Sequence, residues 1–305
     1  MRKRLGRIVP WVVATLLVGY LLSRYSLADI ARNMKLAAGW TVPVLAVITF
    51  LVYVADSLAI WKTFGWFVAK LSFKEVLVVR GATYLLALVN YALGQGAIVY
   101  FVNRSRGVPV SRGTAAVLLI MGVNVLMLLA LATLGLLFVP ERDRRLDVVV
   151  GIAYAGLVVY AALVVIKPRF LTSKPIFDVL LSAGLTDYLK AMAARAPHIL
   201  SLLALTYTSL RAFHVDVPPG QAILCLPMVY FVAVLPISPQ GLGTTEAMLT
   251  LFFARYAPGG GATVVACSFV SRVIANAVQV GIGFICLRNQ LARDIAPPAK
   301  VEAGA

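Results

Sequence analysis

Charged side chains are scarce in this sequence. Only 13% of its 305 residues are Asp, Glu, Lys or Arg, whereas hydrophobic residues make up 61%. Soluble domains carry about 25% charged and about 45–50% apolar residues, so the composition excludes an ordinary globular domain and a disordered chain. Because a bilayer core requires roughly 20 apolar residues per helix, the long unbroken apolar runs predict an all-α protein, a polytopic helical membrane bundle.

Residues that build disulfide or metal sites are also few. The three cysteines, Cys225, Cys267 and Cys286, lie in apolar runs without CxxC spacing, which argues against a disulfide framework. The two histidines, His198 and His214, have no neighbouring Cys or His that would complete a zinc site. The sequence contains no Walker loop, which argues against direct coupling to ATP. We therefore expect no metal and no cofactor.

Acidic residues are outnumbered, with 12 Asp and Glu against 28 Lys and Arg and a formal charge of +16. Such an excess can indicate nucleic-acid binding. Here, however, most charges lie between apolar runs, where basic residues set membrane orientation and contact anionic lipids. We therefore expect anionic membrane lipids as partners and no nucleic acid.

The amino-terminal segment carries four basic residues before the first apolar run, residues 8–22. By the positive-inside rule they place the N-terminus in the cytoplasm of a multi-pass protein of the cell (inner) membrane. The segment is also similar to a signal peptide, with residues 26–28 as a cleavage site. A whole membrane domain follows it, which favours an uncleaved first helix.

Eight apolar runs predict about eight transmembrane spans. They are residues 8–22, 40–60, 76–93, 114–139, 148–166, 198–213, 221–237 and 262–287. Two pieces, 97–103 and 245–256, are too short to cross alone and are predicted to be re-entrant or interfacial helices. We expect one membrane domain over residues 1–288 and a disordered cytoplasmic tail over 289–305.

Three basic segments, 103–112, 140–147 and 167–197, cannot all lie in the cytoplasm if the spans alternate strictly. This conflict predicts a re-entrant segment or a miscounted span. Within the third segment, apolar residues from Ile176 to Leu185 form a partial helical stripe. Residues 174–197 are therefore predicted to form an amphipathic helix on the surface of the bundle.

Two regions repeat the same order of parts: a Gly-interrupted apolar segment, a short apolar piece, a basic turn and a long apolar helix. The first interruption spans residues 90–96, with Gly94, Gln95 and Gly96 in it, and the second spans residues 236–243. Broken segments at corresponding positions in two halves are typical of transporter binding sites, because unwound backbone must be buried or line a wet cavity. The pattern predicts an internal repeat with two Gly-broken or re-entrant segments. The alternative is that Gly and Pro are simply frequent in membrane helices.

The second interruption carries the most informative polar residues. Ser238, Gly241 and Gly243 lie in it, and the glycines permit a positive φ. Thr244 or Thr245 is predicted to cap a new helix with Glu246 in its first turn. The free amides of that turn favour an anion. We expect Glu246 to pair with a buried arginine or carry a proton; the alternative is a structural carboxylate at a capped helix start.

The last apolar run presents one polar face. Ser268, Arg272, Asn276 and Gln279 are spaced by four, four and three residues, so they align on a helix. An arginine at membrane depth is costly and faces a bundle interior or a wet cavity. We expect Arg272 to bind a lipid phosphate, or alternatively to form a structural ion pair. Because isolated buried charges are unfavourable, Arg272 and Glu246 are predicted to pair directly or through water.

Other polar residues receive structural or interfacial interpretations. Arg80 aligns with Tyr84 and Tyr91 on one helical face, or alternatively extends to the cytoplasmic interface, which is the favoured interpretation. Asp56 is interpreted as a partner of Arg80 or a proton site. Asn90 and Asn124 are expected to form interhelical hydrogen bonds. Two residues of the first basic turn region, Arg106 and Arg112, either collect anionic headgroups or set orientation.

The second interruption resembles a family signature. The pattern Pro-x-Ser-x-x-Gly-x-Gly-x-x-Glu, matched by Pro236, Ser238, Gly241, Gly243 and Glu246, is typical of the lysylphosphatidylglycerol synthase transmembrane-region family, also called the flippase-like domain family. The resemblance extends over most of the chain, including residues 60–62, 94–96 and 107–112. The chain has Tyr100 where many members carry an arginine, and Asn124 near where they carry a charged pair.

This resemblance implies a membrane domain that binds or translocates lipids. In the lysyl-lipid synthases the domain is associated with flipping aminoacylated phosphatidylglycerol, and a separate soluble domain, which this sequence lacks, makes it. We therefore expect no aminoacyl-transfer or glycosyltransferase activity. The first hypothesis is a translocator of an anionic lipid or lipid-linked intermediate. Its lipid-binding site is expected to consist of residues 94–96, Arg106, Arg112, the second interruption and the polar face of the last apolar run.

Two further hypotheses are kept. The protein is a non-transporting membrane partner of a lipid- or glycan-modifying enzyme, or it is a membrane-embedded transferase for lipid-linked sugars. The scarcity of acid–base residues in the apolar runs, apart from Asp56 and Glu246, argues against the transferase. A homo-oligomer is also considered.

Overall fold

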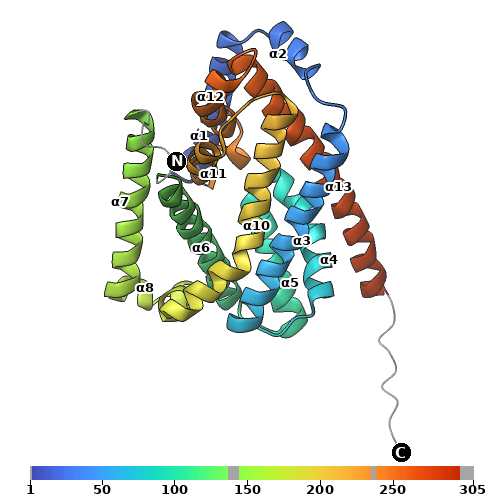
Figure 1. The fold of residues 1–305 in the computed structure, drawn as a ribbon. Helices are drawn as coiled ribbons and strands as arrows, with labels where there is room; N and C mark the ends of the chain where they lie inside the picture. Colours follow the sequence, from blue (N-terminus) through green and yellow to red (C-terminus); the bar gives the residue numbers. More distant parts are fainter. Residues whose placement is uncertain (1, 137–143, 235–237, 296–305) are drawn as a thin grey trace, which may run out of the picture.

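The computed structural model describes residues 2–136, 144–234 and 238–295, and these ranges contain helices and no strand. The first helices are α1 (Arg2–Arg24), α2 (Leu27–Met34), α3 (Thr41–Phe67), α4 (Phe73–Val89), α5 (Tyr91–Arg106), α6 (Val110–Leu136) and α7 (Arg144–Ile166). They are followed by α8 (Arg169–Thr172), η1 (Pro175–Phe177), α9 (Asp178–Ser182), α10 (Leu185–Ala212), α11 (Pro219–Val234), η2 (Pro239–Gly241), α12 (Thr244–Phe253), η3 (Ala254–Tyr256) and α13 (Gly261–Ile295), where η marks a 3₁₀ helix. The predicted all-α bundle is confirmed (Figure 1).

The described parts of the predicted apolar runs are helical apart from the end residues Trp40 and Phe213 and a break at Asn90 within the run 76–93. Among the described helices, α3, α6 and α13 are long and apolar enough to cross a membrane, and the pair α1–α2, bent by 82°, adds a fourth if counted as one span. The described helices therefore supply three or four candidate crossings, against the predicted eight. Two of the predicted runs, 76–93 and 221–237, each supply an arm of a hairpin.

The first hairpin consists of α4 and α5. A capping box starts α4, in which Ser72 accepts a hydrogen bond from the Glu75 backbone at 3.2 Å. The helix breaks at Asn90, whose backbone is extended and whose side chain accepts from the Ala92 N–H to start α5. At the end of α5, Arg106 lies 2.9 Å from Glu75, so the chain returns to the level at which it entered.

The break in this hairpin differs from the prediction in two respects. Gly94, Gln95 and Gly96 lie inside α5, so the interruption is the single residue Asn90. Asn90 caps α5 instead of forming the predicted interhelical bond. The small Gly94 serves the close packing of the arms, because a Cβ there would lie 2.7 Å from the Ala87 Cβ on α4.

The second hairpin consists of α11 and α12, joined through η2. After α12 the chain continues through η3, and the Tyr256 carbonyl accepts from the Asp216 N–H at 3.2 Å. Asp216 lies just before α11, so this hairpin also returns to the level at which it began. The predicted Gly-broken segment is therefore a re-entrant hairpin.

The two halves of the molecule repeat one another in opposite directions. Helices α3–α6 and α10–α13 each form a long helix, a hairpin and a second long helix (Figure 1). The Ala38 N–H before α3 bonds the Ala212 carbonyl at the end of α10 at 2.9 Å, which makes the leading helices antiparallel. Across the halves α3 packs on α10, α4 on α13 and α11 on α6. This arrangement confirms the predicted internal repeat as an inverted one, a plan common in membrane transporters.

Glycines allow close approach of α6 to α11 and of α13 to α4, two helix pairs that are equivalent in the repeat. A Cβ on Gly135 of α6 would lie 2.5 Å from the Leu224 Cα of α11, and a Cβ on Gly283 of α13 would lie 2.7 Å from Leu85 of α4. Small residues let helix backbones approach within a membrane, where van der Waals packing drives association. The first arm of each hairpin, α4 or α11, thus packs most extensively against a helix of the opposite half.

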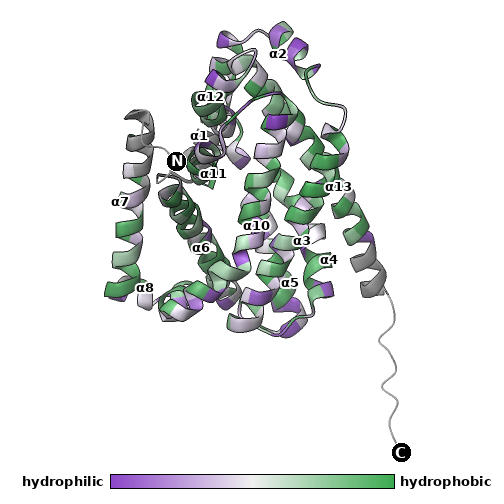
Figure 2. Ribbon diagram, in the orientation of Figure 1, coloured by the Kyte–Doolittle hydropathy of each residue, from purple (hydrophilic) through white to green (hydrophobic). Residues whose placement is uncertain are grey.

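The ends of the bundle carry most of the hydrophilic residues. Figure 2 shows hydrophilic colour on α2 at one end and around the lower end of α5 at the other. Residues 174–197, predicted as one surface helix, form η1, α9 and the first half of α10. Helix α13 continues to Ile295, so residues 289–295 are helical where a disordered tail was expected; residues 296–305 lie outside the described chain.

Candidate functional site

The second hairpin turns through the Gly-rich interruption. Gly241 and Gly243 have φ values of +70° and +80°, a region that favours glycine. The Ser238 and Thr244 hydroxyls lie 2.9 Å apart and bridge the two sides of the turn. Gly243, and neither of the predicted threonines, is the residue that caps α12. The family-pattern residue Pro236 lies outside the described residues.

Glu246 connects this turn to the last long helix. One carboxylate oxygen, Oε2, accepts from the Gly243 N–H at 2.7 Å, so the Glu246 side chain bonds the backbone of the residue that caps α12. The other, Oε1, accepts from Arg272 Nη2 at 2.6 Å, from Arg272 Nε at 3.1 Å and from Ser268 Oγ at 3.2 Å. The predicted Glu246–Arg272 pair is confirmed, and Glu246 is also the structural carboxylate of a capped helix start.

Arg272 and Glu246 are not equally enclosed. The Glu246 side chain is 11% exposed, whereas the Arg272 side chain is 25% exposed and reaches the surface of the protein. Asn276 and Gln279 lie one and two turns further along α13 and are also half-buried. The guanidinium is thus accessible from one side while its partner is held inside.

The tip of the second hairpin contacts the tip of the first. Gln240 in η2 donates through its side chain to the Ala87 carbonyl, near the end of α4. Its own carbonyl accepts from Arg272 Nη1 at 3.4 Å. The tips of the two broken segments, which begin at opposite ends of the bundle, therefore meet beside the Glu246–Arg272 pair, with Gln240 and residues 89–91 exposed.

The other predicted lipid-binding residues lie apart from this pair. Arg106 is ion-paired with Glu75 at the mouth of the first hairpin, and Arg112 donates to the Phe67 carbonyl at 2.9 Å. Gly94, Gln95 and Gly96 lie in the first two turns of α5. The structure groups Ser238, Gly241, Gly243, Glu246 and Arg272 around one turn, and the lipid-binding role of all these residues stays a prediction.

A second charge cluster lies where α3, α4 and α10 meet. Asp56, 1% exposed, accepts from Arg80 Nε at 2.5 Å and from Arg195 Nη1. Arg195 Nε donates to the Asn124 side-chain oxygen at 2.5 Å, and His198 Nδ1 lies 3.8 Å from Asp56. Each of these five side chains is buried, so the cluster joins three long helices and the first hairpin through charged hydrogen bonds.

Part of this cluster follows from the sequence and part does not. The pairing of Asp56 with Arg80 and the interhelical bond of Asn124 are confirmed. The expectation that Arg80 extends to the interface is wrong, because its side chain is 8% exposed and bound to Asp56. Arg195 was expected in a basic connecting segment, yet it lies inside α10. Its position three residues before His198, one helical turn, is the signal that would have placed both on one face.

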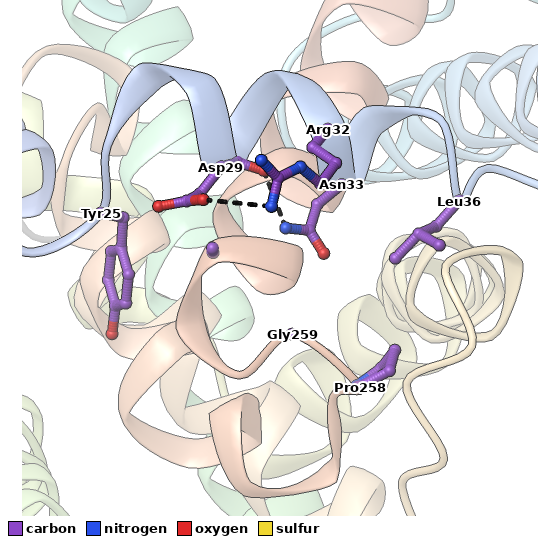
Figure 3. A pocket seen from close by; sticks show the side chains of 8 residues that line it. Tyr25, Asp29, Arg32, Asn33, Leu36, Pro258 and Gly259 are labelled. Atoms are coloured by element: carbon purple, nitrogen blue, oxygen red, sulfur yellow. Dashed lines mark hydrogen bonds and ion pairs between the residues drawn. The ribbon is translucent and has the colours of Figure 1, made fainter.

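A surface pocket of about 490 Å³ lies between α2 and the turn before α13 (Figure 3). Asp29, Arg32 and Asn33 line it from the α2 side, and Arg32 Nη1 lies 3.9 Å from Asp29. Thr263 of α13 donates to Asn33 at 2.6 Å and fixes that wall. None of the described residues that line this pocket is a predicted lipid-binding residue. The Glu246–Arg272 pair therefore remains the candidate site.

The partly exposed guanidinium of Arg272 gives the candidate site the chemistry to bind an anion. A guanidinium binds carboxylate and phosphate through the same planar arrangement of donors. Glu246 at present supplies the carboxylate, and the exposed side of Arg272 leaves room for a second anion. An incoming phosphate can therefore share or replace the contact with Glu246.

Comparison with known proteins adds to this geometry. The search of curated proteins finds no significant match. A scan of family models matches residues 7–283 to the family described as the lysylphosphatidylglycerol synthase TM region. That match includes both hairpins, the Gly-rich interruption and the Glu246–Arg272 pair. The chain is a multi-pass membrane protein that belongs to the lysylphosphatidylglycerol synthase TM region family.

Proposed function

We propose that this protein binds an anionic lipid, or a lipid-linked intermediate, and translocates it across the membrane. The observation that carries the proposal is the meeting of two hairpins from opposite ends beside a partly exposed arginine. In inverted-repeat transporters the substrate site lies at such broken helices near mid-membrane. The family is described as the membrane region of a synthase whose product is a phosphatidylglycerol derivative, and this description supports a lipid as the substrate.

Arg272 is the proposed contact for the lipid phosphate. A guanidinium at membrane depth needs an anionic partner, and Glu246 provides one while the site is empty of lipid. When a phosphate takes its place, Glu246 keeps its bond to the Gly243 N–H at the start of α12. The acyl chains remain in the surrounding lipid, which the apolar outer faces of the helices contact.

The hairpin tips are the proposed gate. Gln240 holds the tip of the second hairpin to α4 through one side-chain hydrogen bond, so separating the tips breaks few polar contacts. Movement of one half against the other would expose the site to either side in turn, as the inverted repeat allows. We place the end that carries Lys70, Lys74, Arg106 and Arg112, with the N-terminus, on the cytoplasmic side of the inner membrane.

Lipids retained by the purified protein test this proposal. Mass spectrometry of the wild-type protein should identify a co-purified anionic lipid, and Arg272→Gln should retain less of it. Arg211→Gln is the matched control, because Arg211 is 49% exposed and pairs with Asp216 outside the site. Equal lipid retention in wild type and Arg272→Gln would contradict the assignment. A tightly co-purifying enzyme, without lipid transport by the protein alone, would support the non-transporting partner instead.

A further inference from the structure

The carboxylate of Glu246 is balanced by a single guanidinium. Its side chain is 11% exposed, and within the described residues Arg272 is the one charged group with which it forms an ion pair. Its other contacts, the Gly243 N–H and the Ser268 hydroxyl, are neutral donors. The site without lipid therefore has one negative and one positive charge and is neutral, which is the favourable state for charged groups at membrane depth.

The elements packed around Glu246 add neutral or distant groups. Helix α12 packs against α1, α11, η3 and α13. Leu17 of α1, which lies against the turn before α12, is apolar. Tyr230 of α11 lies within electrostatic range of Arg272, and a phenol is neutral at physiological pH. Arg255 of η3 follows Glu246 by about two and a half helical turns. Arg272 is therefore the group that keeps Glu246 ionised.

Lipid binding changes this charge balance. The present inference rests on the proposed function, in which a lipid phosphate takes the place of Glu246 on Arg272. A phosphodiester adds one negative charge, so a single guanidinium would then face two anions. Glu246 is more enclosed than Arg272, with 11% against 25% of the side chain exposed, so water compensates its charge poorly. A buried carboxylate that loses its counter-charge normally takes up a proton and becomes neutral.

We propose that one proton binds to Glu246 with each lipid, so that the protein is an electroneutral symporter of an anionic lipid and a proton. The proton comes from water on the side to which the site is open, and it bonds to Oε1, the oxygen that Arg272 releases. The Ser268 hydroxyl, 3.2 Å away, can accept the hydrogen bond of the new acid. Oε2 keeps its bond to the Gly243 N–H.

The cycle closes when the lipid leaves on the other side of the membrane. Arg272 then pairs again with Glu246, and the proton returns to water on that side. The site is neutral both with lipid and proton and without them, so it can change the side that it faces in either state. A site with lipid but no proton would carry a net negative charge at membrane depth, which opposes that change.

The pH dependence of lipid binding tests the proposal. Binding of phosphatidylglycerol to the purified full-length protein should weaken as the pH rises from about 5 to about 8, by up to about tenfold per pH unit, because one proton is bound with each lipid. The phosphodiester keeps one negative charge throughout, so the lipid itself does not cause the change. Equal affinity across this range would overturn the coupling. Equal affinity in wild type and Arg272→Gln would instead contradict the proposed function.

Glu246→Gln is the sharpest variant, because glutamine resembles a protonated glutamate and carries no charge. The variant should bind phosphatidylglycerol at least as tightly as the wild type does at low pH, and its affinity should not change with pH. Asp216→Asn makes the same chemical change in an exposed pair outside the site and should keep the wild-type pH dependence. A pH dependence that persists in Glu246→Gln would assign the proton to another group and contradict the proposal.

A pH gradient across vesicles tests the coupling in the wild-type protein and covers the case in which Glu246→Gln does not fold. With an acidic exterior, fluorescent phosphatidylglycerol should accumulate in the inner leaflet beyond the level in protein-free vesicles. A potassium diffusion potential without a pH gradient should have no effect, because lipid and proton together carry no net charge. Fast exchange that leaves the label equal in both leaflets would overturn the coupling, whereas exchange no faster than in protein-free vesicles would contradict lipid transport itself.

Discussion

The two charge clusters of this protein use the same side-chain chemistry in different surroundings. The Asp56–Arg80–Arg195 cluster joins long helices, and its side chains are 2–8% exposed. The Glu246–Arg272 pair lies at a hairpin tip, and its arginine is 25% exposed. An arginine enclosed on all sides is a fixed structural element, whereas an arginine with one open side can exchange its anionic partner. Burial, and not the presence of an ion pair, therefore distinguishes the structural cluster from the candidate lipid site.

Asp56→Asn should produce the largest effect on stability. The change leaves two buried guanidinium groups without a counter-charge, and breaking a buried pair costs about 3–5 kcal/mol in the free energy of unfolding. Denaturant titration of the purified protein in detergent measures this loss. Asp216→Asn is the control, because its pair with Arg211 is exposed and contributes about 0–1 kcal/mol. Equal losses in the two variants would contradict the contrast between the clusters.

Glu246→Gln should destabilise the protein less than Asp56→Asn. Arg272 loses its charged partner but has an open side, so the expected cost is about 1–3 kcal/mol, that of a lost hydrogen bond to a charged group. The double variant Glu246→Gln/Arg272→Gln should recover part of the stability without recovering lipid retention. A loss as large as that of Asp56→Asn would show that the pair is as enclosed as the buried cluster.

Gly243→Ala tests the turn that positions Glu246. A side chain is disfavoured at φ +80°, and the new Cβ would lie 2.8 Å from the Leu17 Cβ, so we expect a cost of about 1–3 kcal/mol. Gly96→Ala is the matched control, since a Cβ there meets open space within α5 and alanine favours a helix by about 0.5–1 kcal/mol. Thermal unfolding of the two variants should shift in opposite directions.

The exposed pair Glu75–Arg106 should give the smallest effect. The Ser72 N–H, above all, and Arg106 hold the pKa of Glu75 below its ordinary value of 4.5. Its stabilisation is therefore complete above the ordinary pKa and is lost as the pH falls through the lowered folded-state pKa. We expect about 0.3–1 kcal/mol, because the pair is partly exposed. The free energy of unfolding should fall less steeply at acidic pH in Glu75→Gln than in the wild type. An unchanged fall would show that other carboxylates cause the loss of stability in acid.

The sequence predicts the features that depend on local pattern. Apolar runs locate the helices, the Gly-rich interruption locates the second hairpin, and the spacing on α13 places Arg272 on a polar face toward Glu246. The predictions that are wrong concern contacts between segments far apart in the sequence. Arg80 and Arg195 look like interfacial residues until α3 and α10 pack together and bring Asp56 between them. The predicted first interruption, residues 90–96, is too long, because the local signal of the glycines extends it past Asn90, the residue at which the helix breaks.

Transport by reconstituted protein tests the central claim most directly. Vesicles with fluorescent phosphatidylglycerol and wild-type protein should exchange label between leaflets faster than protein-free vesicles. Arg272→Gln should slow this exchange about tenfold or more, because a charge-assisted hydrogen bond contributes about 1.5–3 kcal/mol and each 1.4 kcal/mol is a factor of ten. Arg211→Gln should match the wild type. Equal exchange with and without the wild-type protein, or between wild type and Arg272→Gln, would contradict the account.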